Sequence, residues 1–301
     1  MDENVNDNAG LAERFEANRS HLRGVAYRML GSLSDADDAV QEAWIRLSRA
    51  DAGAIDNLQA WLTTVVGRVC LNMLRSRATR REESLETHVP DFIVSPQEGL
   101  DPEQEALLGD SVGLALFVVL DSLTPAERVA FVLHDIFAVP FEQVAPIIDR
   151  TPTAARQLAS RARRRVQGAP VPDVALDGQW AVADAFLAAA RAGDFGALLA
   201  VLDPDIVLRS DGGAARPSLV SHVRGAQAVA GQAMSFRQFT ETATRILVNG
   251  IPGGVAWMPD GTPFAILALT VRGGRIVEIE VLADPDRLAQ LDLTAVTSRH
   301  V

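Results

Sequence analysis

The sequence of 301 residues has no lysine and a single cysteine, Cys70. One cysteine excludes an internal disulfide and a zinc site built from several cysteines, so we expect neither a metal nor another cofactor. No apolar run reaches the ~18 residues that a membrane helix needs. Residues 1–10 are acidic and Asn-rich, unlike a signal peptide, and are expected to form a disordered leader. These absences predict a cytoplasmic protein without membrane contact.

Charge is unevenly distributed along the chain. The formal net charge is −11, which argues against nucleic acid at first, but all basic residues are arginines and they cluster. The segments 68–81 and 150–167 are basic and free of acid, whereas acid is concentrated between them and near the start. This alternation suits a protein that touches DNA with some faces and a basic protein partner with another. Ordinary solvated helix faces are the alternative interpretation.

The length fits two or three domains, each large enough to bury a core. Periodicity and proline positions predict a multidomain chain, with two all-α domains followed by an α+β domain. The expected boundaries are a helical domain at 11–81, an acidic, proline-containing linker at 82–105, a second helical domain at 106–168, a short linker at 169–176, an α+β domain at 177–290 and a C-terminal tail at 291–301.

The first predicted helix with a distinctive surface spans residues 32–47, with Ser34 as a candidate N-cap. Its alanines, valine, tryptophan and last leucine recur at three- and four-residue spacing and predict the buried stripe. Asp38, Gln41 and Glu42 then lie on a different face. On this segment alone, an ordinary amphipathic helix is an equally good interpretation.

A second helix is expected from about residue 57 to 77, with a basic side formed by Arg68, Asn72, Arg75 and Arg77. Arginine neutralises phosphate, and asparagine can hydrogen-bond a base edge. A basic helix beside an aromatic ring also suits unstacked bases of a single strand. That ring is Trp61, for which core packing is the alternative role.

The strongest local signal lies at residues 141–166, which predict a helix, a tight turn and a second helix. Thr151 is an N-cap, and Pro152 occupies the first helical position, where its missing N–H costs nothing. Pro146 is expected to shorten or kink the first helix. One apolar stripe of the second helix faces the core, so the residues on its other side are candidates for contacts in the DNA major groove. These residues are Thr153, Arg156, Gln157, Ser160, Arg161 and Arg164.

The C-terminal third changes to two helices within 177–203 and then to strands at 206–210, 242–248, 255–258, 264–271 and 276–282. Hairpin turns are expected at 259–261 and 272–274. Helices followed by a curved antiparallel sheet predict a cone-like α+β fold. Asp211, His222 and Asp284 are candidate general bases, but the two aspartates are more typical of turns and the lone histidine of a structural or surface position, so no catalytic residue is assigned.

Taken together, these motifs resemble the extracytoplasmic-function sigma factors of the sigma-70 family. D-A-D-D-A-V-Q-E-A-W-I-R-L (35–47) is similar to the family's segment that binds core polymerase, and N-L-Q-A-W-L-T-T-V-V-G-R-V-C-L-N-M-L-R-S-R (57–77) to the segment that melts and reads the −10 element. Residues 123–145 and the arginine-rich helix after them resemble the −35 reader. The C-terminal domain resembles the SnoaL and NTF2-like folds, which enclose a pocket, and the SigJ-like group combines all of these parts.

The resemblance implies sigma region 2 at 11–81, sigma region 4 with its helix-turn-helix at 106–168, and a SnoaL-like regulatory domain at 177–290. Asp38, Gln41 and Glu42 match positions that contact the β′ clamp helices of core RNA polymerase. Trp61, Arg68, Asn72, Arg75 and Arg77 would contact −10 DNA, and the outward face of residues 153–164 would contact −35 DNA. Promoter DNA and the polymerase are therefore the expected partners, with a small molecule in the C-terminal pocket as a further candidate.

Three motifs of that subgroup appear here in altered form. A Trp-Leu-Pro-Glu-Pro-like linker stretch is replaced by His88-Val89-Pro90-Asp91-Phe92, which predicts a change in its usual inter-domain docking contact. The other two motifs keep their charge and turn character. They are represented by Asp211-Gly212-Gly213, followed by two alanines and an arginine, and by Asp284-Pro285-Asp286-Arg287, followed by a leucine.

The leading functional hypothesis is a non-enzymatic subunit that directs RNA polymerase to promoters and is regulated in cis by its C-terminal domain. One alternative is a stand-alone helix-turn-helix regulator, which would bind DNA tightly by itself, usually as a dimer. The sequence shows no separate dimerisation helix. A less favoured alternative is an isomerase or cyclase with a DNA-binding appendage, which would depend on Asp211 or Asp284 for turnover.

Overall fold

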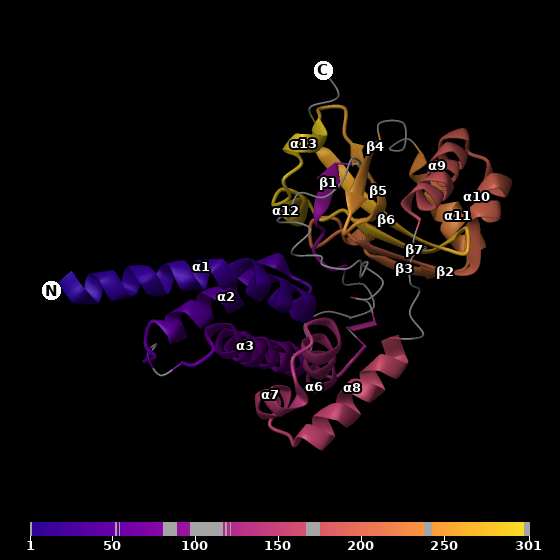
Figure 1. The fold of residues 1–301 in the computed structure, drawn as a ribbon. Helices are drawn as coiled ribbons and strands as arrows, with labels where there is room; N and C mark the ends of the chain where they lie inside the picture. The colour runs from indigo at the N-terminus through magenta and orange to yellow at the C-terminus, as the bar shows by residue number, and fades with distance from the viewer. Residues whose placement is uncertain are drawn as a thin grey trace. The chain divides into compact units, whose positions relative to one another are not determined.

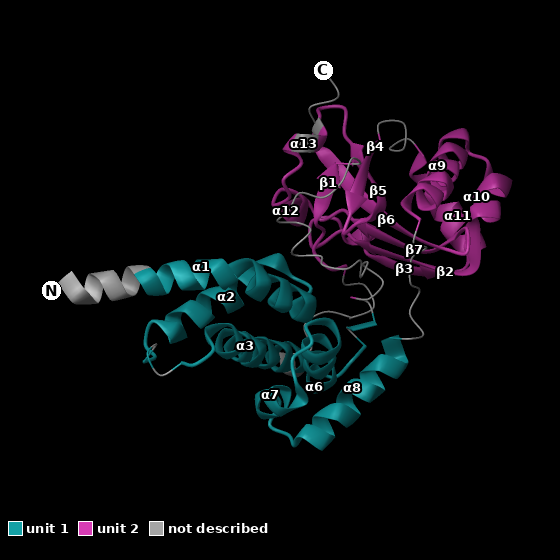
Figure 2. Ribbon diagram, viewed as in Figure 1, with its two compact units in different colours: residues 1–82, 102–109, 119–168 teal, residues 83–101, 110–118, 169–301 magenta. Residues whose placement is uncertain are grey.

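The structure is a computed structural model that describes residues 2–51, 53, 55–80, 89–96, 117, 119–120, 122–166, 175–237 and 243–297. Most of the two predicted linkers, His88, residues 106–116 and the end of the tail lie outside this part of the chain. Figure 2 shows two compact units. The helical unit contains residues 1–82, 102–109 and 119–168, and the second contains residues 83–101, 110–118 and 169–301.

The first half of the helical unit consists of α1 (Asp2–Leu30), α2 (Leu33–Leu47) and α3 (Leu58–Arg80), which pack on one another (Figure 1). The segment predicted as a leader falls on the first turns of α1, and later turns of this helix bury Phe15 and Leu22. The cap of α2 is Ser32 rather than Ser34, since the backbone N–H of Asp35 donates to the Ser32 hydroxyl.

The second half of the helical unit contains the predicted helix-turn-helix. Its elements are α6 (Pro125–Phe131), a π-helical turn (Val132–Ile136), α7 (Phe141–Ile147) and α8 (Pro152–Val166). As predicted, the helix that contains Pro146 is short, at seven residues. The hydroxyl of Thr151 caps α8 by accepting from the N–H of Ala154 at 3.2 Å. The turn between α7 and α8 places Asp149 at φ 56°, a conformation that aspartate tolerates better than most residues.

The two halves of the helical unit meet at Gly67 in the middle of α3. A Cβ atom at this position would lie 3.3 Å from side-chain carbons of Ile147 and of Leu133. Gly67 is buried, so its missing side chain lets α7 and the π-helical turn approach the α3 backbone closely. Glycine in a helix interior is otherwise unfavourable by about 1 kcal/mol, which makes close packing the physical reason for it here.

The second unit is built on one seven-stranded sheet with the order β1-β4-β5-β6-β7-β2-β3 (Figure 1). Its strands are β1 (Val94–Pro96), β2 (Leu202–Asp211), β3 (Ser221–Arg224), β4 (Thr244–Val248), β5 (Ile251–Trp257), β6 (Pro263–Arg272) and β7 (Arg275–Leu282). β2 runs parallel to β7, and all other neighbours are antiparallel. The α+β class is as predicted, whereas β1 and β3 are strands that the sequence pattern missed.

Each face of the sheet has its own core. On one face lie α9 (Leu176–Ala192), α10 (Phe195–Val201) and α11 (Ala226–Ser235), which bury Trp180, Phe186 and Leu198 among others. On the other face, α12 (Pro285–Leu288) and α13 (Thr294–Thr297) pack with Phe92 and Val94 from the segment predicted as a linker. The C-terminal unit therefore takes part of its core from chain that lies between the two helical halves.

Two tight hairpins set the register of the sheet. Gly273 and Gly274 both have positive φ between β6 and β7, where a turn was predicted. Asn249 and Gly250 do the same between β4 and β5, at φ 50° and 80°. The sequence signal for this second hairpin is the Asn-Gly dipeptide, which lies between the strands expected at 242–248 and 255–258. In the part of the chain that the structure describes, no helix is long and apolar enough to cross a membrane.

Candidate functional surfaces

The outward face of α8 gathers the residues predicted to contact −35 DNA. Together they line one shallow polar depression formed by Thr153, Arg156, Gln157, Ser160, Arg161 and Arg164. The opposite side of the helix is fully buried through Ala155, Ala159 and Ala162. Small residues on the packed side let α8 lie close to its neighbours, while long cationic side chains project to solvent. This is the division that a helix needs if it is to enter a groove of DNA.

Two carboxylates hold α8 from the side of α6 and the π-helical turn. Glu127, which is 4% exposed, accepts from Arg165 at 3.0 Å and lies 3.6 Å from Arg161. Asp135 accepts from Arg163 at 2.8 Å. Three of the arginines near the end of α8 are therefore engaged inside the domain. Arg163 and Arg165 have a structural role, and Arg161 is shared between Glu127 and the outward face.

Glu127 also closes the N-terminus of α6. Its carboxylate accepts from the backbone N–H and the hydroxyl of Thr124, and the Thr124 hydroxyl in turn accepts from the backbone N–H of Glu127. Burial by itself would raise the pKa of Glu127. The bonds from Thr124 and the charges of Arg165 and Arg161 outweigh that effect and lower the pKa below its ordinary value. Glu127 therefore stays ionised and couples the α6 cap to α8.

The acidic face of α2 is exposed as predicted. Asp38 and Gln41 are exposed, and Glu42 accepts from Arg46 at 2.8 Å one turn along the helix. Spacings of three and four residues place the three side chains on one side. Another acidic residue of α2 has a different role, since Arg23 donates to Asp37 at 2.7 Å and ties α1 to α2. Asp38 and Gln41 thus present a carboxylate and an amide to solvent, and Glu42 lies beside them in its pair with Arg46.

The residues predicted to contact −10 DNA are only partly free on α3. Asn72 is exposed and Trp61 is half-buried. Arg77 donates to the carbonyl of Leu30 at 3.0 Å and pairs with Asp35, so it fastens α3 to α1 and α2. We did not anticipate this structural role from the arginine spacing.

Two further arginines of α3 face the helix-turn-helix. Arg68 donates to the carbonyl of Pro146 at 3.3 Å, and Arg75 lies 3.9 Å from the carboxylate of Asp149. Both contacts involve α7 or the turn before α8. In this conformation, part of the predicted −10 surface is occupied by the half of the unit that carries the predicted −35 surface.

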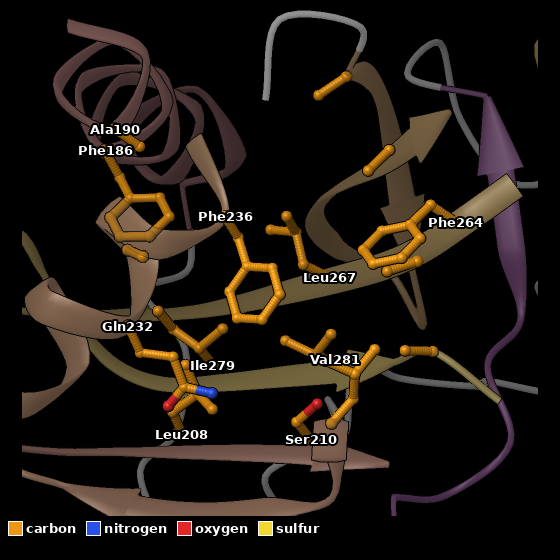
Figure 3. Close-up of a pocket in the computed structure, with 16 residues that line it drawn as sticks. Phe186, Ala190, Leu208, Ser210, Gln232, Phe236, Phe264, Leu267, Ile279 and Val281 are labelled. Atoms are coloured by element: carbon orange, nitrogen blue, oxygen red, sulfur yellow. The ribbon is translucent and has the colours of Figure 1, made fainter. Parts of the chain in front are cut away.

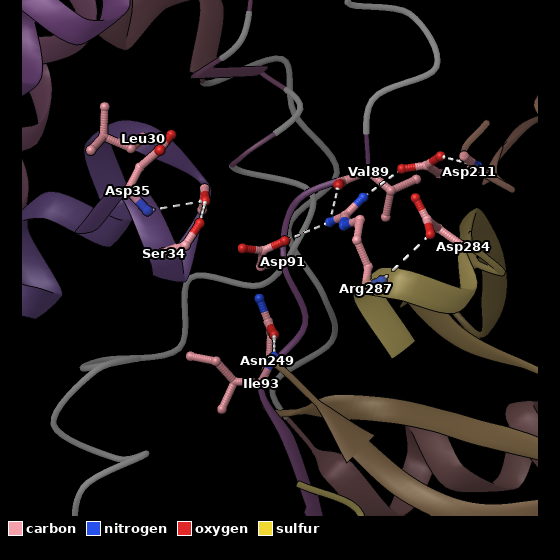
Figure 4. A network of polar contacts seen from close by, with 12 residues as sticks. Leu30, Ser34, Asp35, Val89, Asp91, Ile93, Asp211, Asn249, Asp284 and Arg287 are labelled. Atoms are coloured by element: carbon pink, nitrogen blue, oxygen red, sulfur yellow. Dashed lines mark hydrogen bonds and ion pairs between the residues drawn. The ribbon is translucent and has the colours of Figure 1, made fainter. Parts of the chain in front are cut away.

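The segment 89–96 is docked onto the C-terminal unit through Arg287 (Figure 4). The guanidinium of Arg287 donates to the Val89 carbonyl and to the Asp91 carboxylate, each at 2.7 Å, and also to Asp211. A docking contact at this stretch is thus present despite the altered sequence. A backbone carbonyl is independent of side-chain identity, and Asp91 keeps a carboxylate where the related motif has glutamate. Asn249 adds a pair of bonds to the backbone of Ile93.

The two glycines of the Asp211-Gly212-Gly213 turn are needed for this docking site. Gly213 has φ 59°, and a Cβ atom there would collide with the side chain of Asp284. A Cβ atom at Gly212 would collide with the carbonyl of Arg216. Asp284 caps α12, with Pro285 at its first position, by accepting from the backbone N–H of Asp286 and Arg287. The turn at residues 211–213 and the start of α12 are therefore packed against each other and joined by the Arg287–Asp211 pair.

The candidate general bases occupy structural or surface positions. Asp211 pairs with Arg287, Asp284 is a helix cap, and His222 is exposed on β3. Burial raises the pKa of the Cys70 thiol to about 12, so this thiol is unreactive at neutral pH. Over the described ranges, no cluster of three or more acidic, histidine or cysteine side chains could hold a metal.

Known protein families match both halves of the helical unit. The family model of Sigma-70 region 2 matches residues 14–80, and that of Sigma-70, region 4 matches residues 114–166. ECF RNA polymerase sigma factor SigJ of Mycobacterium tuberculosis (strain ATCC 25618 / H37Rv) is 39% identical over 289 residues, 91% of each chain. The probable ECF sigma factor SigI of the same strain is 38% identical over 288 residues, 93% of this chain and 96% of the relative. The SigJ crystal structure matches with a TM-score of 0.77 and 36% identity, covering 94% of this chain and 99% of the other.

Replacing Glu127 with glutamine is expected to destabilise the helical unit by about 1–2 kcal/mol at pH 7, because charge-assisted bonds to Thr124 and Arg165 are lost. The folded-state pKa of Glu127 lies below its ordinary value of 4.5. The stability that the ionised Glu127 contributes is therefore complete above the pKa that Glu127 has in the unfolded chain. It is lost as the pH falls through the pKa of Glu127 in the folded protein. Urea unfolding of both proteins between pH 7 and pH 3 measures the difference.

Glu142→Gln is the matched control, because Glu142 is exposed on α7. We expect this control to match the unchanged protein at every pH. A stability gap between Glu127→Gln and the unchanged protein that is the same at pH 7 and at pH 3 would contradict the role of the ionised carboxylate.

Proposed function

The chain belongs to the extracytoplasmic-function sigma factors. From this premise we propose which of its surfaces contact promoter DNA and which surface contacts the polymerase. As a sigma factor it directs RNA polymerase to promoters and is not an enzyme. Family membership replaces the two alternatives drawn from the sequence, a stand-alone regulator and an isomerase or cyclase. The open question is which residues contact which partner.

The outward face of α8 reads the −35 element. The observation that carries this assignment is the single depression lined by the six residues Thr153 to Arg164, backed by a helix side that is fully buried. The guanidinium carbon of Arg156 lies 5.2 Å from the centre of the Phe141 ring, a cation–π contact that orients this group at the surface. Arginine recognises guanine edges or phosphates, and Gln157 can read an adenine edge. Glu127 and Asp135 fix the orientation from which these side chains project.

The anionic face of α2 binds core polymerase, through the β′ clamp helices that the family resemblance implies. Asp38, Gln41 and Glu42 supply carboxylate and amide oxygens on one exposed side of the helix. Such a face would repel DNA and attract a basic protein surface. On α3, Trp61, Asn72, Arg68 and Arg75 contact the −10 element, while Arg77 supports them by holding α3 in place.

Promoter recognition requires the two halves of the helical unit to separate. The −35 and −10 elements are, by their names, about 25 base pairs apart, or roughly 85 Å along a duplex with ~3.4 Å per base pair. The helices α3 and α7 instead touch at Gly67, with Arg68 bonded to Pro146. The compact arrangement is therefore a resting state. Because only open molecules can bind, the apparent affinity for promoter DNA is reduced in proportion to the fraction of molecules that are open.

The C-terminal unit regulates this opening in cis, through the chain that connects the two halves. We call the described part of this chain, residues 89–96, the connector. Its strand β1 pairs with β4, and Arg287 bonds to Val89 and Asp91 just before the strand. If the halves separate, the connector between them must either move together with the C-terminal unit or come off that unit. A contact of this kind needs a coupling energy of only about 1–3 kcal/mol to change activity several-fold.

Replacing Arg161 and Arg164 with alanine is expected to weaken promoter use without weakening polymerase binding, because both side chains lie on the α8 face. Replacing Asp38 and Glu42 with alanine should do the reverse. Run-off transcription from a promoter selected from a library, together with a pull-down of core polymerase, separates the two effects. Arg272→Ala is the control, because it removes an exposed arginine at the β6–β7 hairpin that belongs to neither surface. Unchanged polymerase binding by the acidic double variant would refute the assignment of α2.

Replacing Arg287 with alanine is expected to release the connector, because one guanidinium supplies the bonds to Val89 and Asp91. Amide hydrogen exchange of residues 89–96 should become at least about tenfold faster, and promoter-dependent transcription should change. Arg224→Ala is the control, since Arg224 forms an exposed pair with Asp205 on the same unit. Faster exchange with unchanged transcription would exclude the connector as the regulatory contact.

Replacing Gly67 with leucine is expected to favour the open state, since the side chain would push against Ile147 and Leu133. Binding of the selected promoter DNA without polymerase should strengthen by about three- to tenfold, in proportion to the gain in open molecules. Ala78→Leu, at an exposed position of α3, is the control. A folded Gly67→Leu protein that binds the DNA no better than this control would contradict a closed resting state.

A further inference from the structure

The C-terminal unit encloses an apolar cavity of about 110 Å³ between the sheet and the helices α9 and α11 (Figure 3). Phe186, Phe236 and Phe264 contribute aromatic rings to its wall. On the sheet side, the wall comes from the face of β7 that carries Ile279 and Val281. None of the sixteen residues that line the cavity is titratable. None of them belongs to the surfaces assigned above to promoter or polymerase.

Two polar side chains interrupt the apolar wall. Ser210 on β2 is buried, and Gln232 comes from α11. The amide nitrogen of Gln232 donates to the Ser221 hydroxyl at 3.1 Å, which fixes the side chain and leaves its oxygen as an acceptor. Ser221 is in turn the cross-strand partner of Ser210. Both polar groups thus belong to the region where β2, β3 and α11 meet.

From these features we propose that the cavity binds a small uncharged molecule, with an apolar body of about one ring and a single hydroxyl or amide group that donates to the Gln232 oxygen and accepts from the Ser210 hydroxyl. An apolar cavity of about 150 Å³ in another protein stays dry and accepts benzene, so a cavity of this size suits one ring. Longer acyl chains and peptide segments exceed it.

The charge of the occupant follows from the lining. An ion placed among apolar side chains loses its hydration without gaining a partner, and this cost is large. The nearby cation Arg216 does not line the cavity, because it donates to the carbonyls of Phe264 and Ala283 and lies over the Phe264 ring. A neutral molecule with one hydrogen-bonding group is the chemistry that the wall can satisfy completely.

The lining residues differ in exposure. Leu219, Phe236 and Phe264 are half-buried, whereas Phe186, Leu208 and Ile279 are buried. This inference does not depend on which residues read the promoter.

Titration of the full-length protein with benzyl alcohol, toluene and benzoate, followed by ligand-observed NMR, tests the proposal. These probes share one ring and differ in their polar group. Benzyl alcohol should bind at least about tenfold more tightly than benzoate, because benzoate would bury an unpaired charge. Toluene should bind more weakly than benzyl alcohol. Absence of binding by all three, or equal binding of benzoate, would overturn the proposal.

Variants locate the binding. Ala233→Phe fills the cavity and should weaken benzyl alcohol binding by at least about tenfold, whereas Ala228→Phe, at an exposed position of the same helix, should leave it within about twofold. Gln232→Leu keeps the volume but removes the acceptor, so benzyl alcohol should then bind no better than toluene. Binding that survives both Ala233→Phe and Gln232→Leu would place the probe elsewhere and overturn the assignment.

Discussion

The close approach of α7 to α3 at Gly67 is the packing on which the state of the helical unit depends. Without a Cβ atom at that position, Ile147 and Leu133 reach the helix backbone, and Arg68 and Arg75 find partners in and beside the helix-turn-helix. The contact is made of a few apolar atoms, one hydrogen bond and one long ion pair. Such a contact can hold a resting state and still yield to a partner that binds the separated form more tightly.

Electrostatics separates the surfaces that the packing brings together. Acid faces outward on α2 and arginine faces outward on α8. Two further arginines of α8, Arg163 and Arg165, are engaged by Asp135 and Glu127. The net charge of −11 hides this arrangement, because the sum says nothing about which helix face carries which sign. The C-terminal unit adds a mechanical constraint, since it incorporates the connector as strand β1 and fixes it through Arg287.

Sequence patterns identified the elements whose signal is local. Thr151 and Pro152 mark the start of α8, and the spacing of its alanines sets the face that α8 buries, so its outward residues were found together. The strand β1 was not foreseen, because residues 94–96 acquire their structure by pairing with β4, more than 140 residues away in sequence. The structural role of Arg77 depends on Asp35 and the Leu30 carbonyl, which no periodicity within α3 reveals. Local sequence patterns do not determine which distant residue a single side chain contacts.

Promoter recognition as proposed depends most on the separation of the two halves of the helical unit. Ser76 on α3 and Glu142 on α7 are exposed, and the buried Cys70 thiol, with a pKa raised to about 12, stays unlabelled when these two are replaced by cysteine. The distance between labels at these positions is the decisive measurement, made in the free protein and in the promoter-bound holoenzyme. We predict one short distance in the free protein and an increase of several tens of ångströms in the holoenzyme, as expected for elements about 25 base pairs apart. An unchanged distance in a transcriptionally active complex would contradict the account.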